Sequence, residues 1–259
     1  MIIVIIVCTC LLLSIALTAS DKYKIIHQVT GGVETNCYLL YDIKSKEAAL
    51  IDIGGSIDSL ISVIKSNNLD LKYLLCTHGH TDHVLGIPEV KKLYPNAKIV
   101  LSKSDYIDLF AVKEWADKNL GPEFQNYMRS NPAMRKIYYF DANSLGEPDI
   151  YTEDILFLPF GDSEINVFHT PGHSPGSVCY QIENIIFSGD LIFCRRAGRT
   201  DFMNGSRAEL VKSFKKIYDL FQDNMIVYPG HDKFTDLDSE KKENKSVSLM
   251  VASGDNKQL

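Results

Sequence analysis

The sequence predicts an α/β protein in which two β-sheets pack together and carry helices on their outer faces. From Tyr23 onward, short apolar runs rich in β-branched and aromatic residues alternate with helical patterns. No long linker or low-complexity segment interrupts this alternation. With 259 residues, 45% of them hydrophobic, the chain is long enough for one large domain or two small ones with a sizeable core.

The individual elements follow from local patterns. The expected strands are Lys24–Val29, Cys37–Tyr41, Ala48–Ile53, Tyr73–Cys76, Lys98–Leu101, Ile165–His169, Val178–Ile182, Ile185–Ser188 and Met225–Tyr228. The expected helices are Ile57–Asn67, Leu85–Leu93, Lys103–Asn119, Glu123–Met128 and Arg207–Phe221. The last helix is the best specified, because Ser206 and Glu209 form a capping box before a repeating apolar face.

Two segments differ from this regular pattern. Residues 103–153 place Trp115 and several Phe, Tyr and Met residues among charges and turn residues. This composition is typical of two packed helices, and it also fits an inserted, partly apolar cap over a site. From Asp236 the sequence is rich in Lys, Glu, Asp and Ser, so we expect a solvated helix and a flexible tail over 247–259.

Residues 1–20 have the composition of a targeting segment. They carry no charged side chain, and small residues close the apolar run before Asp21. This layout favours a cleaved signal peptide. An uncleaved N-terminal anchor is the alternative, because no Lys or Arg precedes the run and about 17 apolar residues is the short end of a membrane span. We therefore expect entry into the secretory pathway or secretion, with membrane anchoring through this segment as the alternative.

Charge and cysteine content exclude some classes. The net charge is −6, and no basic run supplies the surface that a nucleic-acid-binding protein needs. Six cysteines are too few for a disulfide scaffold. Four of them follow the first twenty residues, each in or beside an apolar run, and we interpret these as buried side chains, with disulfide pairing left open: Cys37, Cys76, Cys179 and Cys194.

Five polar clusters directly follow predicted strands, and they carry the chemistry of the sequence. They are Ile51–Gly55, Thr77–His83, Thr170–Ser177, Ser188–Asp190 and Tyr228–Asp232. Five of the seven histidines lie in these clusters, together with several aspartates. Imidazole nitrogens and carboxylate oxygens are ligands of divalent metals of borderline softness, so the clusters predict a metal site. His27 and His169 lie inside strand patterns, and we expect structural roles for them.

The motifs THGHTDH, TPGHSPGS, SGD and YPGHD, in this order, resemble the metallo-β-lactamase superfamily. The resemblance extends from Tyr23 to about Ser246, and it implies a catalytic domain over 22–246. Members of that family are four-layer αββα sandwiches with a metal site at the edge of the two sheets. The segment GRTDF at 198–202, with Glu240 and Asn244, is similar to the glyoxalase-II-like hydrolases of this family.

The resemblance implies roles for individual residues. His78, His80 and His173 correspond to the ligands of one metal, Asp82, His83 and His231 to those of a second, and Asp190 to a bridge between the two. Asp82 and Asp190 are the expected catalytic residues, with Asp82 also orienting a metal-bridging hydroxide. Asp52 is expected to brace the metal loops from outside. Three arginines that follow Asp190 are weaker candidates for binding an anionic substrate group: Arg195, Arg196 and Arg199.

The implied activity is that of a metal-dependent hydrolase. The expected cofactor is Zn²⁺, two per chain, with iron or manganese as alternatives, and the expected substrate is a small molecule: a hydroxyacylglutathione-like thioester or another small acyl compound. Two other readings stay open: a persulfide dioxygenase with one iron on His78, His173 and Asp190, and a non-catalytic metal-binding protein. The substrate stays open because typical glyoxalase II enzymes carry a C-terminal helical domain, where this sequence has a short tail with Lys245 in place of an expected proline.

Overall fold

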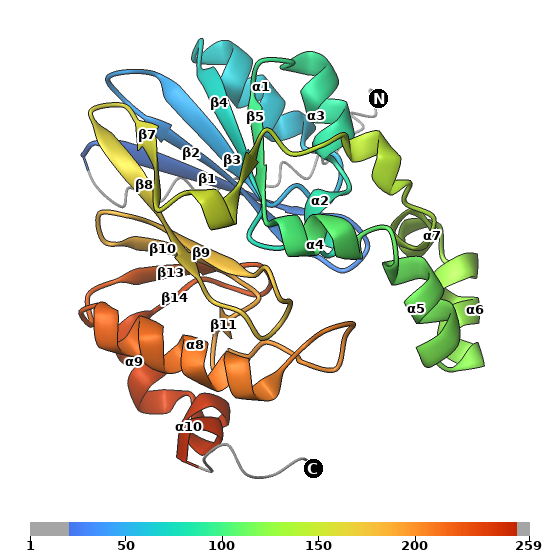
Figure 1. The fold of residues 1–259 in the computed structure, drawn as a ribbon. Coiled ribbons are helices and arrows are strands. Elements are labelled where there is room, and N and C mark those ends of the chain that lie inside the picture. Colours follow the sequence, from blue (N-terminus) through green and yellow to red (C-terminus); the bar gives the residue numbers. More distant parts are fainter. Residues whose placement is uncertain (1–20, 253–259) are drawn as a thin grey trace, which may run out of the picture.

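A computed structural model describes residues 21–252, and it confirms the predicted fold class. Two β-sheets face each other between two outer layers of helices (Figure 1). The predicted signal or anchor at 1–20 lies outside the described residues. Within 21–252, no helix is both long enough and apolar enough to cross a membrane.

The first sheet is built from the N-terminal half of the chain. In spatial order its strands are β1 (Tyr23–Thr30), β2 (Thr35–Asp42), β3 (Glu47–Ile51), β4 (Asp70–Leu75), β5 (Lys98–Leu101) and β6 (Ile150–Tyr151). The pairs β1–β2 and β2–β3 are antiparallel, and the pairs from β3 to β6 are parallel. Parallel neighbours need crossover connections, and the helices between these strands supply them.

The second sheet is built from the C-terminal half. In spatial order its strands are β14 (Thr235–Asp236), β13 (Ile226–Pro229), β10 (Ile185–Gly189), β9 (Val178–Ile182), β8 (Ser163–His169) and β7 (Phe157–Phe160). The strands β10 and β13 are parallel, and the other pairs are antiparallel. A separate short hairpin joins β11 (Ile192–Phe193) to β12 (Arg196–Ala197).

Helices cover the outer faces of both sheets (Figure 1). Beside the first sheet are α1 (Asp58–Ser66), α2 (Thr81–Val84) and α3 (Ile87–Leu93); beside the second are α8 (Arg207–Leu220), α9 (Leu237–Glu243) and α10 (Lys245–Ala252). In α8, Leu210, Phe214 and Ile217 pack against the second sheet, as the sequence pattern predicts. The Ser206 hydroxyl accepts from the Glu209 backbone N–H at 3.3 Å and caps this helix.

Central strands such as β2 and β10 are buried on both faces, which explains why they read as nearly continuous apolar runs. In β2, Cys37 and Leu39 face the helices of the first layer, whereas Tyr38 and Leu40 face the second sheet. The core between the sheets is closed by side chains such as Phe187 of β10. This packing joins the two halves of the chain into one body.

The segment between β5 and β7 forms a helical projection at one side of the molecule (Figure 1). It contains α4 (Lys103–Asp108), α5 (Val112–Asn119), α6 (Pro122–Ser130), α7 (Pro132–Tyr138) and the 3₁₀ turns η1 (Ala142–Leu145) and η2 (Thr152–Asp154). The single helix predicted over Lys103–Asn119 is wrong, because the chain turns at 109–111 between α4 and α5. The predicted flexible tail also begins too early, since Val247 in α10 is 1% exposed and packs under the second sheet.

Candidate metal centre

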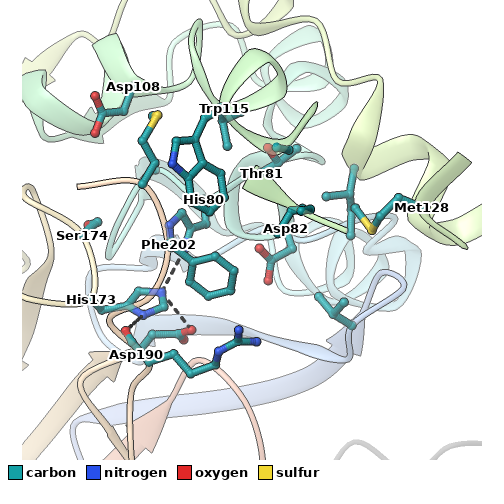
Figure 2. A pocket seen from close by; sticks show the side chains of 18 of the residues that line it. His80, Thr81, Asp82, Asp108, Trp115, Met128, His173, Ser174, Asp190 and Phe202 are labelled. Atoms are coloured by element: carbon teal, nitrogen blue, oxygen red, sulfur yellow. Dashed lines mark hydrogen bonds and ion pairs between the residues drawn. The ribbon is translucent and has the colours of Figure 1, made fainter. Parts of the chain in front are cut away.

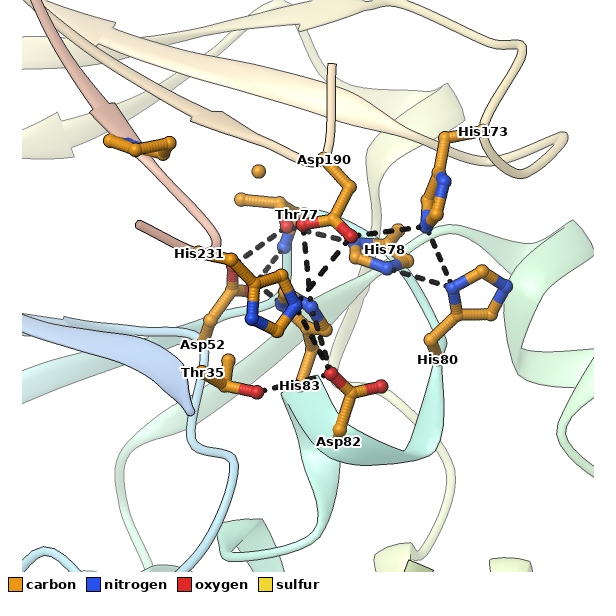
Figure 3. Close-up of polar contacts among 12 residues, drawn as sticks. Thr35, Asp52, Thr77, His78, His80, Asp82, His83, His173, Asp190 and His231 are labelled. Carbon is orange, nitrogen blue, oxygen red and sulfur yellow. Dashed lines mark hydrogen bonds and ion pairs between the residues drawn. The ribbon is translucent and has the colours of Figure 1, made fainter. Parts of the chain in front are cut away.

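The polar clusters meet at one edge of the molecule, where strand ends from both sheets converge (Figure 3). Their positions follow from the topology. In the first half of the chain, Asp52 follows β3, His78 and His80 follow β4, and Asp82 and His83 lie in α2. In the second half, His173 lies between β8 and β9, Asp190 follows β10, and His231 follows β13. The structure therefore brings together all seven predicted ligands and Asp52. None of these residues is within a strand, so their side chains are free to converge on a common point.

The first predicted triad is a tight group of three imidazoles. The Nδ1 atom of His80 lies 3.1 Å from His78 Nε2 and 2.8 Å from His173 Nε2. His78 and His173 are 1% and 2% exposed, so their nitrogens have little access to water. Three nitrogens that face one another at these distances form a ready-made set of donors for one cation.

Neighbouring groups fix which nitrogens of this triad carry lone pairs. The Thr77 hydroxyl donates to Asp52 Oδ2 at 2.7 Å, so its oxygen is left to accept from His78 Nδ1 at 3.1 Å. His173 Nδ1 lies 2.7 Å from the Arg199 carbonyl oxygen, which can only accept. Both rings therefore hold their proton on Nδ1 and direct the lone pair of Nε2 toward His80, as metal-binding histidines do.

The second predicted triad lies beside the first and combines imidazoles with carboxylates. Asp82 Oδ2 lies 3.3 Å from His83 Nε2 and 3.4 Å from His231 Nε2. Asp190 reaches both triads, because its Oδ1 lies 3.5 Å from His83 Nε2 and its Oδ2 lies 3.3 Å from His173 Nε2. Asp190 is thus in the position that the sequence predicts for a bridging ligand.

The electrostatics differ between the two triads. Burial and the neighbouring imidazoles lower the pKa of His80 to about 3, and burial lowers the pKa of His173 to about 4. The pKa of His78 is also well below its usual value, mainly because of burial. These three histidines are therefore neutral at pH 7, in the form that binds a metal.

His83 in the second triad behaves in the opposite way. Burial alone would lower its pKa, but Asp82, Asp52 and Asp190 together raise the pKa of His83 to about 10. The pKa of Asp82 is held below its usual range in spite of burial, because His83 and His231 are close to it. Without a cation, a proton on His83 balances the surrounding carboxylates.

The donor atoms fit a pair of divalent cations. The ligand atoms of each triad lie within 4.8 Å of one another. Among the described residues, His83 Nε2 and Asp190 Oδ1 are buried and have no hydrogen-bond partner, which is costly for polar atoms unless a cation satisfies them. The nitrogen and oxygen donors suit zinc, iron or manganese.

Asp52 lies where the sequence places it, behind the ligands. It accepts from the Thr77 backbone N–H at 2.8 Å and from the Thr77 hydroxyl, and its Oδ2 faces His83 Nδ1 at 3.0 Å. His27 and His169 are structural, as predicted: His27 Nε2 lies 2.7 Å from Asn36 Oδ1, and His169 Nε2 lies 2.9 Å from the Pro175 carbonyl.

Asp105 is a supporting residue that the sequence analysis missed. Its carboxylate, 2% exposed, accepts from Gly79 N at 2.8 Å, from the Ser174 hydroxyl at 2.6 Å and from Gly176 N at 2.6 Å. It thereby ties the loop of His80 to the loop of His173. Its position just after β5, at the same sheet edge as the other clusters, is the signal that could have identified it.

The three arginines have different surroundings. Arg195 is not among the residues that line the cavity over the metal centre; it pairs with Glu240 and Glu243 instead. Arg196 and Arg199 do line that cavity, where each is paired with an aspartate, Asp232 and Asp201 respectively. Glu240 holds the side chain of Arg195 away from this cavity, and a contact of Arg195 with substrate stays a prediction.

A cavity of about 630 Å³ opens over the metal centre. At one end it is lined by ligand candidates, including His80, Asp82, His173 and Asp190, and at the other by the helical projection (Figure 2). Trp115 of α5 and Met128 of α6 lie on that side. Helices within residues 103–153 therefore form one wall of this cavity, and their role as a cap stays a prediction.

The four cysteines within residues 21–252 are free thiols. Cys37, Cys76 and Cys179 are buried in the core, and Cys194 is partly buried. Burial raises the pKa of the Cys37, Cys76 and Cys179 thiols, so they are packing residues and not nucleophiles.

Comparisons with known proteins agree with this geometry. The chain is 29% identical to "Hydroxyacylglutathione hydrolase GloC" of Haemophilus influenzae over 214 residues, which are 82% of this chain and 92% of that protein. The crystal structure of BLEG-1 B3 metallo-beta-lactamase is 31% identical with a TM-score of 0.66, covering 85% of this chain and 98% of that one. The crystal structure of ETHE1 from Myxococcus xanthus shares the fold at 22% identity, with a TM-score of 0.64 and 91% of each chain covered.

The family assignment follows from the extent of the sequence match. The family model described as "Metallo-beta-lactamase superfamily" matches residues 30–233, a range that contains all seven ligand candidates and every strand from β2 to β13. The resemblance that the motifs suggested is confirmed, and the chain belongs to the metallo-beta-lactamase superfamily.

Proposed function

We propose that this protein is a hydrolase that holds two divalent cations, zinc in the first instance, and cleaves a thioester. The observation that carries the proposal is the presence of two complete triads joined by Asp190. The similarity to a protein named hydroxyacylglutathione hydrolase supports a thioester as the substrate class. In the reaction, water adds to the carbonyl carbon, the carbon–sulfur bond breaks, and the products are a carboxylic acid and a thiol.

Individual side chains of the site would have distinct roles in this hydrolysis. When bound, divalent cations supply Lewis acidity to a carbonyl oxygen and to a water molecule. Asp82 stays ionised because of its lowered pKa, and the Thr35 hydroxyl fixes its Oδ2 by donating to it at 3.0 Å. The carboxylate is therefore positioned to accept a hydrogen bond from the attacking water and to orient it. The Ser174 hydroxyl, which lies nearby, donates to Asp105, and we assign it no nucleophilic role.

The dinuclear reading is favoured over a mononuclear iron dioxygenase. Such an enzyme needs two histidines and one carboxylate, which His78, His173 and Asp190 would supply. A single iron on those three ligands would give Asp82, His83 and His231 no metal to bind, although their donor atoms also converge. A complete second set of ligands supports a second cation.

The proposal is tested by hydrolysis of a hydroxyacylglutathione and of S-acetyl-N-acetylcysteamine by the zinc-loaded full chain. We expect Asp82→Asn to lower kcat by at least about 100-fold, because it weakens one metal position and the orientation of water. Asp162→Asn, a change of an exposed carboxylate that pairs with Lys22, is the matched control and should leave the rate unchanged. Oxygen uptake with a persulfide, and no thioester cleavage, would show the dioxygenase instead.

We also propose that the protein enters the secretory pathway, on the composition of residues 1–20 alone. The test is the N-terminal sequence of the protein purified from its own cells. A start near Asp21 supports a cleaved signal, and an intact Met1 in the membrane fraction supports an anchor. An intact Met1 in a soluble protein would contradict both.

A further inference from the structure

The cavity over the metal centre has one polar end and one apolar end. Its polar end consists of the metal ligands, and its other walls consist mainly of apolar side chains from the helical projection and from the loop that follows β12 (Figure 2). Six residues illustrate the apolar walls: Trp115, Leu120, Phe124, Met128, Met134 and Phe202. A cavity of about 630 Å³ falls within the range of about 300–1,000 Å³ that is typical of small-molecule sites.

The apolar wall continues up to the ligands themselves. The ring of Phe202 packs edge-on against His80, with the ring centroids 5.1 Å apart, and against His173 at 5.8 Å. A chain that starts at the metal centre would therefore meet apolar surface from its first carbons onward. The polar contacts would be limited to the reacting group at the metal end.

Polar contacts join the helices of the projection to one another. Asp117 accepts from Arg129 at 2.9 Å and from Lys113 at 2.8 Å, and Arg129 also donates to the Tyr138 hydroxyl at 2.8 Å. Met128, Met134 and Tyr138 form a small apolar cluster, and Met128 and Met134 also line the cavity. Trp115 of α5 and Phe124 of α6 line the cavity as well, so both helices present apolar side chains to it.

The cavity offers few charged groups for a polar substrate. Among the described residues that line it, the two arginines are each already paired, Arg196 with Asp232 and Arg199 with Asp201. Asp108 accepts from Asn204 at 2.9 Å. A ligand with several carboxylates would have to break these pairs, whereas an apolar group would not.

We propose that this cavity binds the apolar acyl chain of the substrate, so that the preferred substrates are thioesters of medium-length fatty acyl groups. The acyl carbonyl would lie at the metal ligands, and the hydrocarbon chain would extend toward Trp115 and Phe124. The inference rests on the proposed function for the reaction, but binding of the chain can be measured without it.

Trp115 makes the binding directly measurable, because it is the only tryptophan of the chain and lines the cavity. Decanoate and butyrate are the probes, since they share a carboxylate and differ only in chain length. Each methylene that leaves water tightens binding about fourfold. We expect both fatty acids to change Trp115 fluorescence saturably. The decanoate concentration that gives half of the full change should be at least about 100-fold lower than the butyrate concentration that does so.

Two half-exposed phenylalanines give a matched pair of variants. Phe124 lines the cavity and is 46% exposed, whereas Phe157 lies in β7, is 50% exposed and does not line it. We expect Phe124→Gln to weaken decanoate binding about five- to tenfold, and Phe157→Gln to leave it unchanged. Leu120→Gln, a second change in the cavity wall, should act like Phe124→Gln and guards against a folding defect in either variant.

The same proteins, loaded with zinc, are then compared on the acetyl, hexanoyl and decanoyl thioesters of N-acetylcysteamine. We expect kcat/KM to rise with chain length, and Phe124→Gln to lower the ratio of the decanoyl to the acetyl value. Equal rates on all three thioesters, with equal affinity for decanoate and butyrate, would overturn the inference and leave the hydrolase intact. Tight, Phe124-dependent binding of decanoate without cleavage of any thioester would support the acyl site and refute the proposed function.

Discussion

Asp52 shows how a residue that is not a predicted ligand orients residues that are. One carboxylate oxygen accepts a hydrogen bond from the Thr77 hydroxyl, which leaves the Thr77 oxygen to accept from His78 Nδ1. The same oxygen faces His83 Nδ1 at 3.0 Å. Asp52 therefore directs one lone pair in each triad toward the metal positions, in the way that supporting carboxylates tune metal-binding histidines.

The two metal positions should differ in their dependence on pH. His80 and His173 have pKa values of about 3 and 4 and bind the first cation without losing a proton at neutral pH, whereas His83, with a pKa of about 10, must release one. Zinc affinity at the second position should thus rise about tenfold per pH unit between pH 6 and 8, while the first changes little. Calorimetric titration in buffers of different ionisation enthalpy counts the released protons. Equal proton release at both positions would contradict this difference.

Gly230 keeps the space between the ligands open. A Cβ atom at this position would clash with Asp190 Oδ1 and lie 2.8 Å from His83 Cε1. We expect Gly230→Ala to displace Asp190 and to lower the bound zinc by about one ion per chain. Gly121→Ala is the control, because a Cβ there meets nothing within 4 Å. Unchanged metal content in Gly230→Ala would contradict the bridging position of Asp190.

At the scale of elements, α4 locks two metal loops in place. It begins after the N-cap Ser102 and presents Asp105 to the backbone N–H groups of Gly79 and Gly176. The helix has only six residues, so its stability depends on this tertiary contact more than on helix propensity. The loops of His80 and His173 are thereby joined through a helix that belongs to neither.

Asp105→Asn should loosen these loops. An amide retains one acceptor oxygen but turns a donor toward the N–H groups, so we expect the free energy of unfolding to fall by about 2 kcal/mol and zinc affinity to fall about 10- to 100-fold. Asp108→Asn, in the same helix, should change the free energy of unfolding by no more than about 0.5 kcal/mol. Denaturant unfolding and zinc titration measure both quantities. Equal effects of the two substitutions would contradict the role of Asp105.

The sequence allowed elements with a strong local pattern to be predicted, and other elements depend on distant contacts. The strands Lys98–Leu101 and Val178–Ile182 have the predicted bounds, since each is an apolar run between polar residues. β7 was missed because Pro159 argues against a strand, and Pro159 is tolerated there because β7 is an edge strand. The ion pair of Arg195 with Glu240 could not be predicted for a similar reason, because Glu240 lies far along the chain.

For the whole molecule, the metal centre exists only when both halves of the chain are packed together. His78, His80, Asp82 and His83 come from the half with the first sheet, and the remaining ligands come from the half with the second. Asn36 of β2 joins the halves directly by donating from its backbone N–H to the Gly230 carbonyl at 2.7 Å. Metal binding should therefore stabilise the packing of the two sheets, because the unfolded chain offers no assembled site.

The most direct test of a dinuclear centre is the metal content of the full chain after zinc reconstitution and removal of free metal, measured by elemental mass spectrometry. We predict about two zinc ions per chain, and loss of the first-position ion in His80→Ala with the fold kept, since His80 Nδ1 faces both other nitrogens of the first triad. One tightly bound iron with no zinc, or no bound metal after reconstitution, would contradict the account.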